Sequence, residues 1–578
     1  MLTLKRWIAG SLLIAGLAAL IVAPCRSAVA QATAPALPAL IPQNSLMVAS
    51  VDVGWLWDTT ASIRKAAKVN DAIEKAEAKT HISIEDDIKP WAGQIAVAVL
   101  DVKKSSASVL VYAQIRDQLK FMATIAKLQA AWQNPPADAK PGSTPKFTTR
   151  DYHGITVFDG TPLGKADEAP SFAILDGWAI AGLGKGTIEH ALDVSQGRSP
   201  SIAADPAMSQ IIAKLPATAN AWGVMNLKGV MDSAPGDAKM PPNVPGFLAE
   251  AARNDMGVAF TDEGKGMRFD IVAAPQTAKG RAIYAKMAKN LPGVSGAILT
   301  KAPDSVLAIM FTSPAYYWNL FVSSMLDTAG SPAERKQMQK GLSTSGAPFV
   351  STLPYFHKDA GLVITWRKDR GYGLALLAQG DSHAAALHAA TTVVKALKQT
   401  GIPLQRGGNS WAAAIPGLDM MVPPTMPFKL APFISAKDDW LVIGSNPTWL
   451  SSTSTPNLQM PPNSDGSPIV ETVSMQWLPS LLDLIQQQAP ADDTDVKQGL
   501  DLVRSLHLET ATASAYYHMD PTGANSAGTA EVTNWDWHAA IDAVVTAAQN
   551  WKPSEKPKGH NLLPKHDADV PQATSPGI

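Results

Sequence analysis

A glycine-rich segment, AGLGKGTIEH at residues 181–190, follows the apolar run FAILDGWAI and leads into a predicted helix. A strand, a glycine-rich turn and a helix form the arrangement that binds phosphate groups in many nucleotide-binding proteins. The spacing differs from the known motifs, because a phosphate-binding loop needs Gly-Lys followed directly by Ser or Thr, whereas Lys185 is followed by Gly186. We therefore expect a structural turn here and no nucleotide cofactor.

Other residue combinations that could support catalysis or zinc binding are also incomplete. Ser62 and Lys65 form an S-x-x-K pair at the start of a predicted helix, but the chain has no Lys-Thr-Gly or Ser-Asp-Asn motif to accompany it. His383 and His388 are five residues apart on a predicted helix, which separates them by about 140° around its axis. We assign no catalytic, cofactor-binding or metal-ligating residue from the sequence.

Two acidic runs, EDD at 85–87 and DDTD at 492–495, are typical of helix N-termini, where negative charge is favourable. Calcium binding is the alternative, although neither run has the glycine and the distal glutamate of a calcium loop. Met420, Met421 and Met426 lie in a proline-rich segment that we expect to be a loop, with soft-metal binding as the alternative.

The chain contains sixteen tryptophans, and many lie in or beside predicted strands. Such tryptophans are typical of core or sheet-end positions. A groove of exposed aromatic residues for a carbohydrate or an apolar ligand is the functional alternative. The tryptophans concerned are Trp55, Trp57, Trp91, Trp178, Trp222, Trp318, Trp366, Trp440 and Trp477.

Residues 1–30 have the features of a secretory signal peptide. Lys5 and Arg6 form a basic start, residues 8–23 are apolar, and the AVA at 28–30 is a cleavage site. The apolar stretch is short for a membrane span, which needs about 20 residues. The sequence therefore predicts an exported protein, in the periplasm or the extracellular space.

The only cysteine, Cys25, falls within the signal peptide, so the mature chain has no disulfide and no thiol nucleophile. An acylated Cys25 is the alternative, but Pro24 stands where a lipoprotein signal has a small residue. The full chain has a net charge of −1 and no basic run, so we expect no nucleic-acid partner. We also expect no membrane span after signal cleavage. Residues 31–40 are a predicted linker, and 551–578 a disordered tail.

Three blocks of the first half recur in the same order in the second half. In each half a hairpin is followed by a helix, and Asp117 and Asp381 are expected to cap those helices. We therefore predict an α+β fold built by tandem duplication of a domain with an antiparallel sheet and helices, over 41–292 and 302–550. The alternative is that two unrelated α+β domains share a hairpin–helix pattern. The recurring blocks are 41–58 with 302–319, 95–117 with 361–381, and 169–188 with 431–450.

Several segments together resemble an exported bacterial family known as domain of unknown function 3352. The resemblance implies export and an α+β repeat, and it implies no activity and no site residues. The family pattern has an acidic residue after its Trp-x-Gly turn, where this chain has Gln94-Ile95. The resembling segments are IPQNSLMVASVD at 41–52, ISIEDDIKPWAGQIAVAV at 82–99, DYHGITVFDG at 151–160, and residues 172–216.

From these observations we favour an exported, non-catalytic binding or scaffold component of the cell envelope over an enzyme. Its partner would be an unknown envelope component or an apolar ligand. The alternatives are a hydrolase with an unrecognised site and a carrier of an apolar or carbohydrate ligand. An enzyme needs titratable groups that converge in one cleft, whereas a binding protein needs an apolar or aromatic concavity.

Overall fold

The computed structural model describes residues 36–551 with internal gaps. The predicted signal peptide, residues 31–35 of the predicted linker and residues 552–578 of the predicted tail therefore lie outside the described residues. The gaps are 67–68, 81, 103–106, 134–146, 161–169, 185, 234–249, 251–252, 327–328, 330, 346–351, 368–370, 414–430, 446–455 and 491–492.

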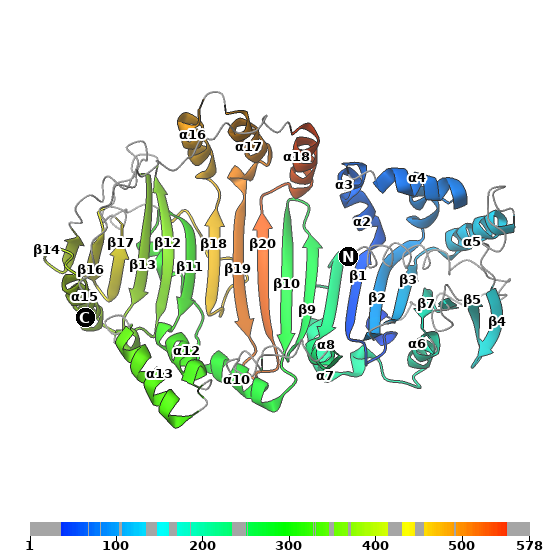
Figure 1. Ribbon diagram of the computed structural model, residues 1–578, viewed down its shortest axis with the longest axis horizontal. Coiled ribbons are helices and arrows are strands. Elements are labelled where there is room, and N and C mark those ends of the chain that lie inside the picture. Colours follow the sequence, from blue (N-terminus) through cyan, green and yellow to red (C-terminus); the bar gives the residue numbers. More distant parts are fainter. Residues whose placement is uncertain are drawn as a thin grey trace, which may run out of the picture.

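Within the described part of the chain, twenty strands form one continuous sheet in which every neighbouring pair is antiparallel (Figure 1). The α+β class predicted from the hairpins is confirmed. The first ten strands are β1 (Met47–Asp52), β2 (Ala92–Val102), β3 (Ala107–Ile115), β4 (Phe147–Tyr152), β5 (Ile155–Gly160), β6 (Pro170–Leu175), β7 (Trp178–Leu183), β8 (Ala221–Asn226), β9 (Asp255–Asp262) and β10 (Gly266–Ala274). The other ten are β11 (Ser305–Thr312), β12 (Asp359–Arg367), β13 (Gly371–Gln379), β14 (Leu404–Gly407), β15 (Ser410–Ala413), β16 (Phe433–Lys437), β17 (Trp440–Gly444), β18 (Ile469–Ser474), β19 (Thr512–Met519) and β20 (Ser526–Thr533).

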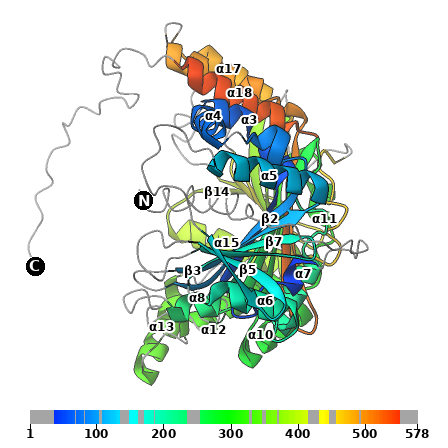
Figure 2. The same cartoon turned by 90° about the vertical axis from the view of Figure 1, so that its right-hand side faces the viewer.

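The helices lie on the two faces of the sheet and beyond the strand ends. In both figures α3, α4, α17 and α18 lie at the top, and α10, α12 and α13 at the bottom (Figures 1 and 2). None of the described helices is long and apolar enough to cross a membrane. The helices are α2 (Val53–Thr59), α3 (Ala61–Ala66), α4 (Val69–Thr80), α5 (Gln118–Gln133), α6 (Thr187–Ser195), α7 (Pro206–Lys214), α8 (Leu227–Ser233), α10 (Ala278–Asn290), α11 (Ala297–Lys301), α12 (Pro314–Leu326), α13 (Pro332–Ser345), α15 (His383–Gln399), α16 (Leu478–Gln488), α17 (Thr494–Ser505) and α18 (Trp537–Asn550). The shorter turns are η1 (Leu37–Ala39), the π-helical η2 (Ile84–Ile88), η4 (Ile202–Ala204), η6 (Leu353–Tyr355) and η9 (Leu508–Thr510).

The two halves of the sheet have the same strand order. The first half runs β4-β5-β6-β7-β3-β2-β1-β8-β9-β10. The second half runs β14-β15-β16-β17-β13-β12-β11-β18-β19-β20, so each strand matches the one numbered ten lower. The halves join where β10 pairs with β20, from Gly266 opposite Thr533 to Ala273 opposite Ser526. A duplication predicts this shared order, but the duplication and its boundaries at 41–292 and 302–550 stay predictions.

The sheet has two faces with different cover. On the covered face, α6, α7 and α11 pack over two hydrophobic cores, one around Trp178 and one around Trp440. On the opposite face, the described helices cover the two ends of the sheet, and between them α2 and α18 contact the end of β9 while α12 contacts Phe311 near the end of β11. At the two ends, α5 packs over Ala113 and Ala179, and α15 packs over the strands that carry Ile434 and Leu441. Figure 1 looks onto this second face, and no helix stands in front of β18, β19, β20 and β10.

The predicted helix caps are correct in one half and wrong in the other. Asp117 accepts a hydrogen bond from the Lys120 N–H at 3.0 Å and so caps α5. The cap of α15 is Ser382, which accepts from the Ala385 N–H at 3.2 Å. Asp381 lies one residue too early for this role, and its carboxylate contacts the His357 ring at 3.1 Å instead.

The glycine-rich segment is a turn between antiparallel β7 and α6, not part of a parallel β–α–β unit. Gly184 and Gly186 have φ values of 105° and 74°, in the region that favours glycine. A Cβ on Gly184 would also lie 3.0 Å from the Thr187 hydroxyl, whereas a Cβ on Gly186 would meet nothing within 4 Å. An alanine at either position would therefore have a strained backbone, and at position 184 it would also be crowded by Thr187.

Replacing Gly184 or Gly186 by alanine should lower the free energy of unfolding by about 1–2 kcal/mol, with the larger loss at Gly184. Urea denaturation measures the change. The matched control is Gly499→Ala in α17, where a Cβ meets nothing within 4 Å and no positive φ is required. That variant should gain up to about 1 kcal/mol in helix stability. Equal stability of the wild type and the Gly184 variant would contradict this account of the turn.

Candidate functional site

The middle of the uncovered face is apolar, although a solvated sheet face normally carries polar side chains. We call this surface the open face. In β10, Phe269 and Ile271 project from it and are 41% and 39% exposed. Their neighbours Arg268 and Asp270 point to the covered face, where Asp270 is buried. The strand thus exposes Phe269 and Ile271 and buries the charged Asp270 between them.

The strand registers place the open-face residues in rows that cross the junction between the halves. One row contains Phe260, Phe269, Ala530, Ala515, Glu471 and Ile309, each directly opposite the next. Residues opposite one another in an antiparallel ladder share a face, so all six project to the same side. A second row contains Met267, Val532, Ala513, Val473 and Leu307.

The two rows line a groove of about 320 Å³ in which small residues lie between large ones. Ala513, Ala515 and Ala530 form its base on β19 and β20. Phe269 on β10 and Leu307 on β11 stand on either side. Since neighbouring strands are about 4.8 Å apart, β10 and β11 are separated by about 19 Å, which is wide enough for a hydrocarbon chain. We call this feature the groove.

An aromatic cluster extends the groove beyond Phe260. The Phe260 ring lies 5.4 Å from Trp55 in α2 and 5.6 Å from Trp537 in α18, between ring centroids. Both indole N–H groups donate to the Asp262 carboxylate, at 3.0 Å and 3.3 Å. The cluster therefore fixes a helix from each half against the end of β9.

The environment of Asp262 keeps its carboxylate charged. Burial acts to raise its pKa, but hydrogen bonds from the Gly264 N–H, Trp55, His538 and Trp537 outweigh burial and lower it. The His538 Nε2 lies 2.8 Å from the carboxylate. Asp262 thus accepts hydrogen bonds from both α2 and α18 and holds the two helices at this end of the groove.

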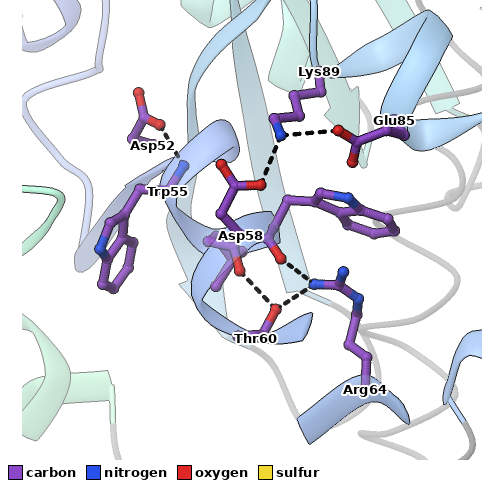
Figure 3. Close-up of polar contacts among 9 residues, drawn as sticks. Asp52, Trp55, Asp58, Thr60, Arg64, Glu85 and Lys89 are labelled. Carbon is purple, nitrogen blue, oxygen red and sulfur yellow. Dashed lines mark hydrogen bonds and ion pairs between the residues drawn. The ribbon is translucent and has the colours of Figure 1, made fainter. Parts of the chain in front are cut away.

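Figure 3 shows how α2 begins next to this cluster. Asp52, the last residue of β1, caps the helix by accepting from the Trp55 N–H at 2.8 Å. The Trp55 indole points away from Asp58, Lys89 and their partners, toward Phe260 and Trp537. The cap therefore fixes the start of α2 and with it the direction in which the Trp55 side chain projects.

The opposite side of α2 carries a polar cluster that pairs within itself. Lys89 contacts the carboxylates of Asp58 at 2.6 Å and Glu85 at 3.0 Å, and these hydrogen bonds raise the pKa of Lys89 (Figure 3). The Arg64 guanidinium lies 3.6 Å from the centre of the Trp57 ring and donates to the Trp57 carbonyl. These contacts hold α2, α3 and η2 together.

The residues that the sequence marked for other chemistry do not come together. Ser62 of the S-x-x-K pair donates to Asp542 of α18, so its hydroxyl takes part in a contact between α3 and α18. His383 bonds to the carbonyl of Asp438, whereas His388 packs against Tyr355. In the described part of the chain, no three His, Cys, Asp or Glu side chains are placed to hold a metal ion.

The acidic runs behave as helix starts where they are described. Residues 85–87 form the first turn of η2, and Asp493 caps α17 by accepting from the Val496 N–H at 3.0 Å. Asp492 lies outside the described residues, as do Met420, Met421 and Met426.

Most of the tryptophans expected in the core are indeed buried or partly buried. Trp91, Trp178 and Trp440 are almost inaccessible to solvent. The groove is lined instead by Phe, Met, Leu, Val and Ala, residues that the sequence analysis did not single out. The available signal was that Phe269 and Ile271 alternate with charged residues in GMRFDIVAA, but this pattern alone assigns the apolar side to the core.

Comparison with known proteins identifies a family and little more. A family model described as "Protein of unknown function (DUF3352)" matches residues 7–340. No curated protein matches the chain. Two crystal forms of TP0453 are similar at 10% identity with TM-scores of 0.25 and 0.23, covering 46% and 45% of this chain and 91% and 87% of that one.

Proposed function

The chain belongs to the DUF3352 family of unknown function, and we propose that it is an exported, non-catalytic protein that binds the hydrocarbon chain of a lipid-like ligand in the groove. One observation carries the proposal: the apolar side chains of β10, β11 and β18–β20 project to an uncovered face and surround a base of alanines. Each methylene that such a surface removes from water contributes about 0.8 kcal/mol. A chain lying along the groove would cover the apolar row that now faces solvent.

The residues that line the groove fit an apolar chain better than they fit a hydrolase active site or a carbohydrate-binding site. A hydrolase needs converging titratable groups, but among the lining residues described only Glu471 projects a charged group into the groove. Glu531 also lines it, yet its carboxylate accepts from Ser514 at 2.9 Å on the covered face. A carbohydrate site needs several polar groups beside an aromatic surface, and the two rows supply almost none.

Export is part of the proposal and rests on the basic start, the apolar stretch and the AVA sequence of residues 1–30. A protein that binds hydrocarbon chains would serve the cell envelope, where lipids must cross water between membranes. N-terminal sequencing of exported material tests this part, and a chain that begins at Gln31 is the expected result. An acylated Cys25 at the N-terminus would contradict it.

Binding of 1-decanol, followed by isothermal titration calorimetry, tests the groove itself. The wild type should bind decanol saturably with a negative heat-capacity change, the signature of apolar burial. Phe269→Asp places a charge beside the alanine base and should weaken binding at least about tenfold, since a charge covered by hydrocarbon loses its water.

The matched control is Leu119→Asp on α5, which changes a side chain that is 85% exposed and lies outside the groove. This variant should bind decanol as the wild type does. The proposal fails if the wild type binds no decanol, or if both variants lose affinity equally.

A further inference from the structure

We propose that the ligand is a single-chain amphiphile with a protonated amine, and that Glu471 binds this amine within the groove. The inference rests on the proposed function, because the chain of the ligand would occupy the apolar rows. It adds the chemical class of the headgroup, which is read from Glu471, the one charged side chain among the described residues that the open face presents to the groove.

Glu471 lies in the middle of the first row. It is opposite Ile309 on β11 and opposite Ala515 on β19, and along β18 its same-face neighbours are Ile469 and Val473. It is exposed, and no described residue is hydrogen-bonded to or ion-paired with its carboxylate. The groove therefore contains an unpaired anion surrounded by apolar side chains.

On the covered face, the charged side chains at the same junction are paired. Arg268 makes a two-pronged contact with Asp270, which also accepts from the Thr529 hydroxyl at 2.7 Å. Glu531, opposite Arg268, accepts from Ser514. Every one of these groups has a protein partner, so the unpaired state of Glu471 is specific to the groove side.

A hydrocarbon chain that covers Glu471 removes water from a charge, which is unfavourable unless the ligand supplies a partner. A protonated amine supplies both charge and hydrogen-bond donors. Charge-assisted hydrogen bonds of this kind correspond to a preference of about ten- to a hundredfold. A fatty acid would instead place a second carboxylate beside the first. The expected order of affinity is amine, then alcohol, then carboxylate.

Calorimetric titration with decylamine, 1-decanol and decanoate at pH 7.5 and low salt tests this order. The wild type should prefer decylamine over decanol by about tenfold or more. Glu471→Gln should remove that preference and leave decanol bound at least as tightly, because the cost of covering the charge is gone. Butylamine, which has the amine without the long chain, should bind far more weakly than decylamine.

The control is Glu263→Gln, which removes one negative charge from the exposed turn between β9 and β10 and should keep the preference. Equal binding of amine and alcohol by the wild type would overturn the inference. So would an amine preference that survives in Glu471→Gln. In both cases decanol binding would persist, and this distinguishes failure of the headgroup assignment from failure of the proposed function, in which no long-chain ligand binds.

Discussion

Replacing Trp178 or Trp440 by alanine is expected to lower the free energy of unfolding by about 3–5 kcal/mol in each case, the usual cost of removing a buried aromatic side chain. Trp178 is 1% exposed in the core of the first half, and Trp440 is 3% exposed in the core of the second. Each opens its strand after a two-residue turn that starts at an aspartate with positive φ, Asp176 or Asp438.

Equal losses at the two tryptophans follow from their equivalent positions on β7 and β17. Urea denaturation followed by circular dichroism measures both, with Trp551→Ala as a control, since Trp551 is exposed beyond the end of α18. The control should change stability by less than about 0.5 kcal/mol. A large loss at one tryptophan and a negligible loss at the other would contradict equivalent roles in the two cores.

Asp255→Asn should stabilise the protein at neutral and alkaline pH. Asp255 is completely buried at the start of β9; burial raises its pKa from 3.8 to about 7, against the effect of a hydrogen bond from Gln276. The unfolded chain therefore releases this proton at lower pH than the folded chain. Stability contributed by the protonated carboxyl is present below pH 4 and is lost as the pH rises to 7.

Asparagine cannot ionise, so the variant avoids this loss. We expect it to match the wild type near pH 4 and to exceed its unfolding free energy by about 2–4 kcal/mol at pH 8. The control lies at the other end of the same strand, where Asp262 has a lowered pKa. Asp262→Asn should therefore lose stability at neutral pH and differ less from the wild type in acid. Parallel pH profiles for the two variants would contradict the assigned environments.

The sequence predicts local structure well because hairpins and capped helices depend on nearby residues. The antiparallel α+β class follows from such signals, and Asp117 caps its helix as expected. The cap at Asp381 was misplaced because Ser382, an equally good capping residue, directly follows it. Duplication predicts that equivalent strands have equivalent neighbours within each half. It does not predict that the halves join by pairing β10 with β20.

The groove could not be predicted from the sequence, and the reason is physical. An alternating strand shows which residues share a face, but not which face is covered. In β10 the usual assumption would bury Phe269 and expose Asp270, whereas the structure does the opposite. Asp270 can be buried because Arg268 and Thr529 satisfy its carboxylate, and Thr529 comes from the other half of the chain. Only the assembled sheet shows that, among the described residues, no helix covers the apolar side of β10 at Phe269 and Ile271.

A crystal structure of the protein with 10-bromodecylamine tests the central claim most directly, because the anomalous scattering of bromine locates the end of the chain. The account predicts a bromine peak in van der Waals contact with the groove, beside residues such as Phe269, Leu307 or Val473, and the amine within hydrogen-bonding distance of Glu471. Bromine peaks found only away from the groove, at a ligand concentration that saturates binding in solution, would contradict it.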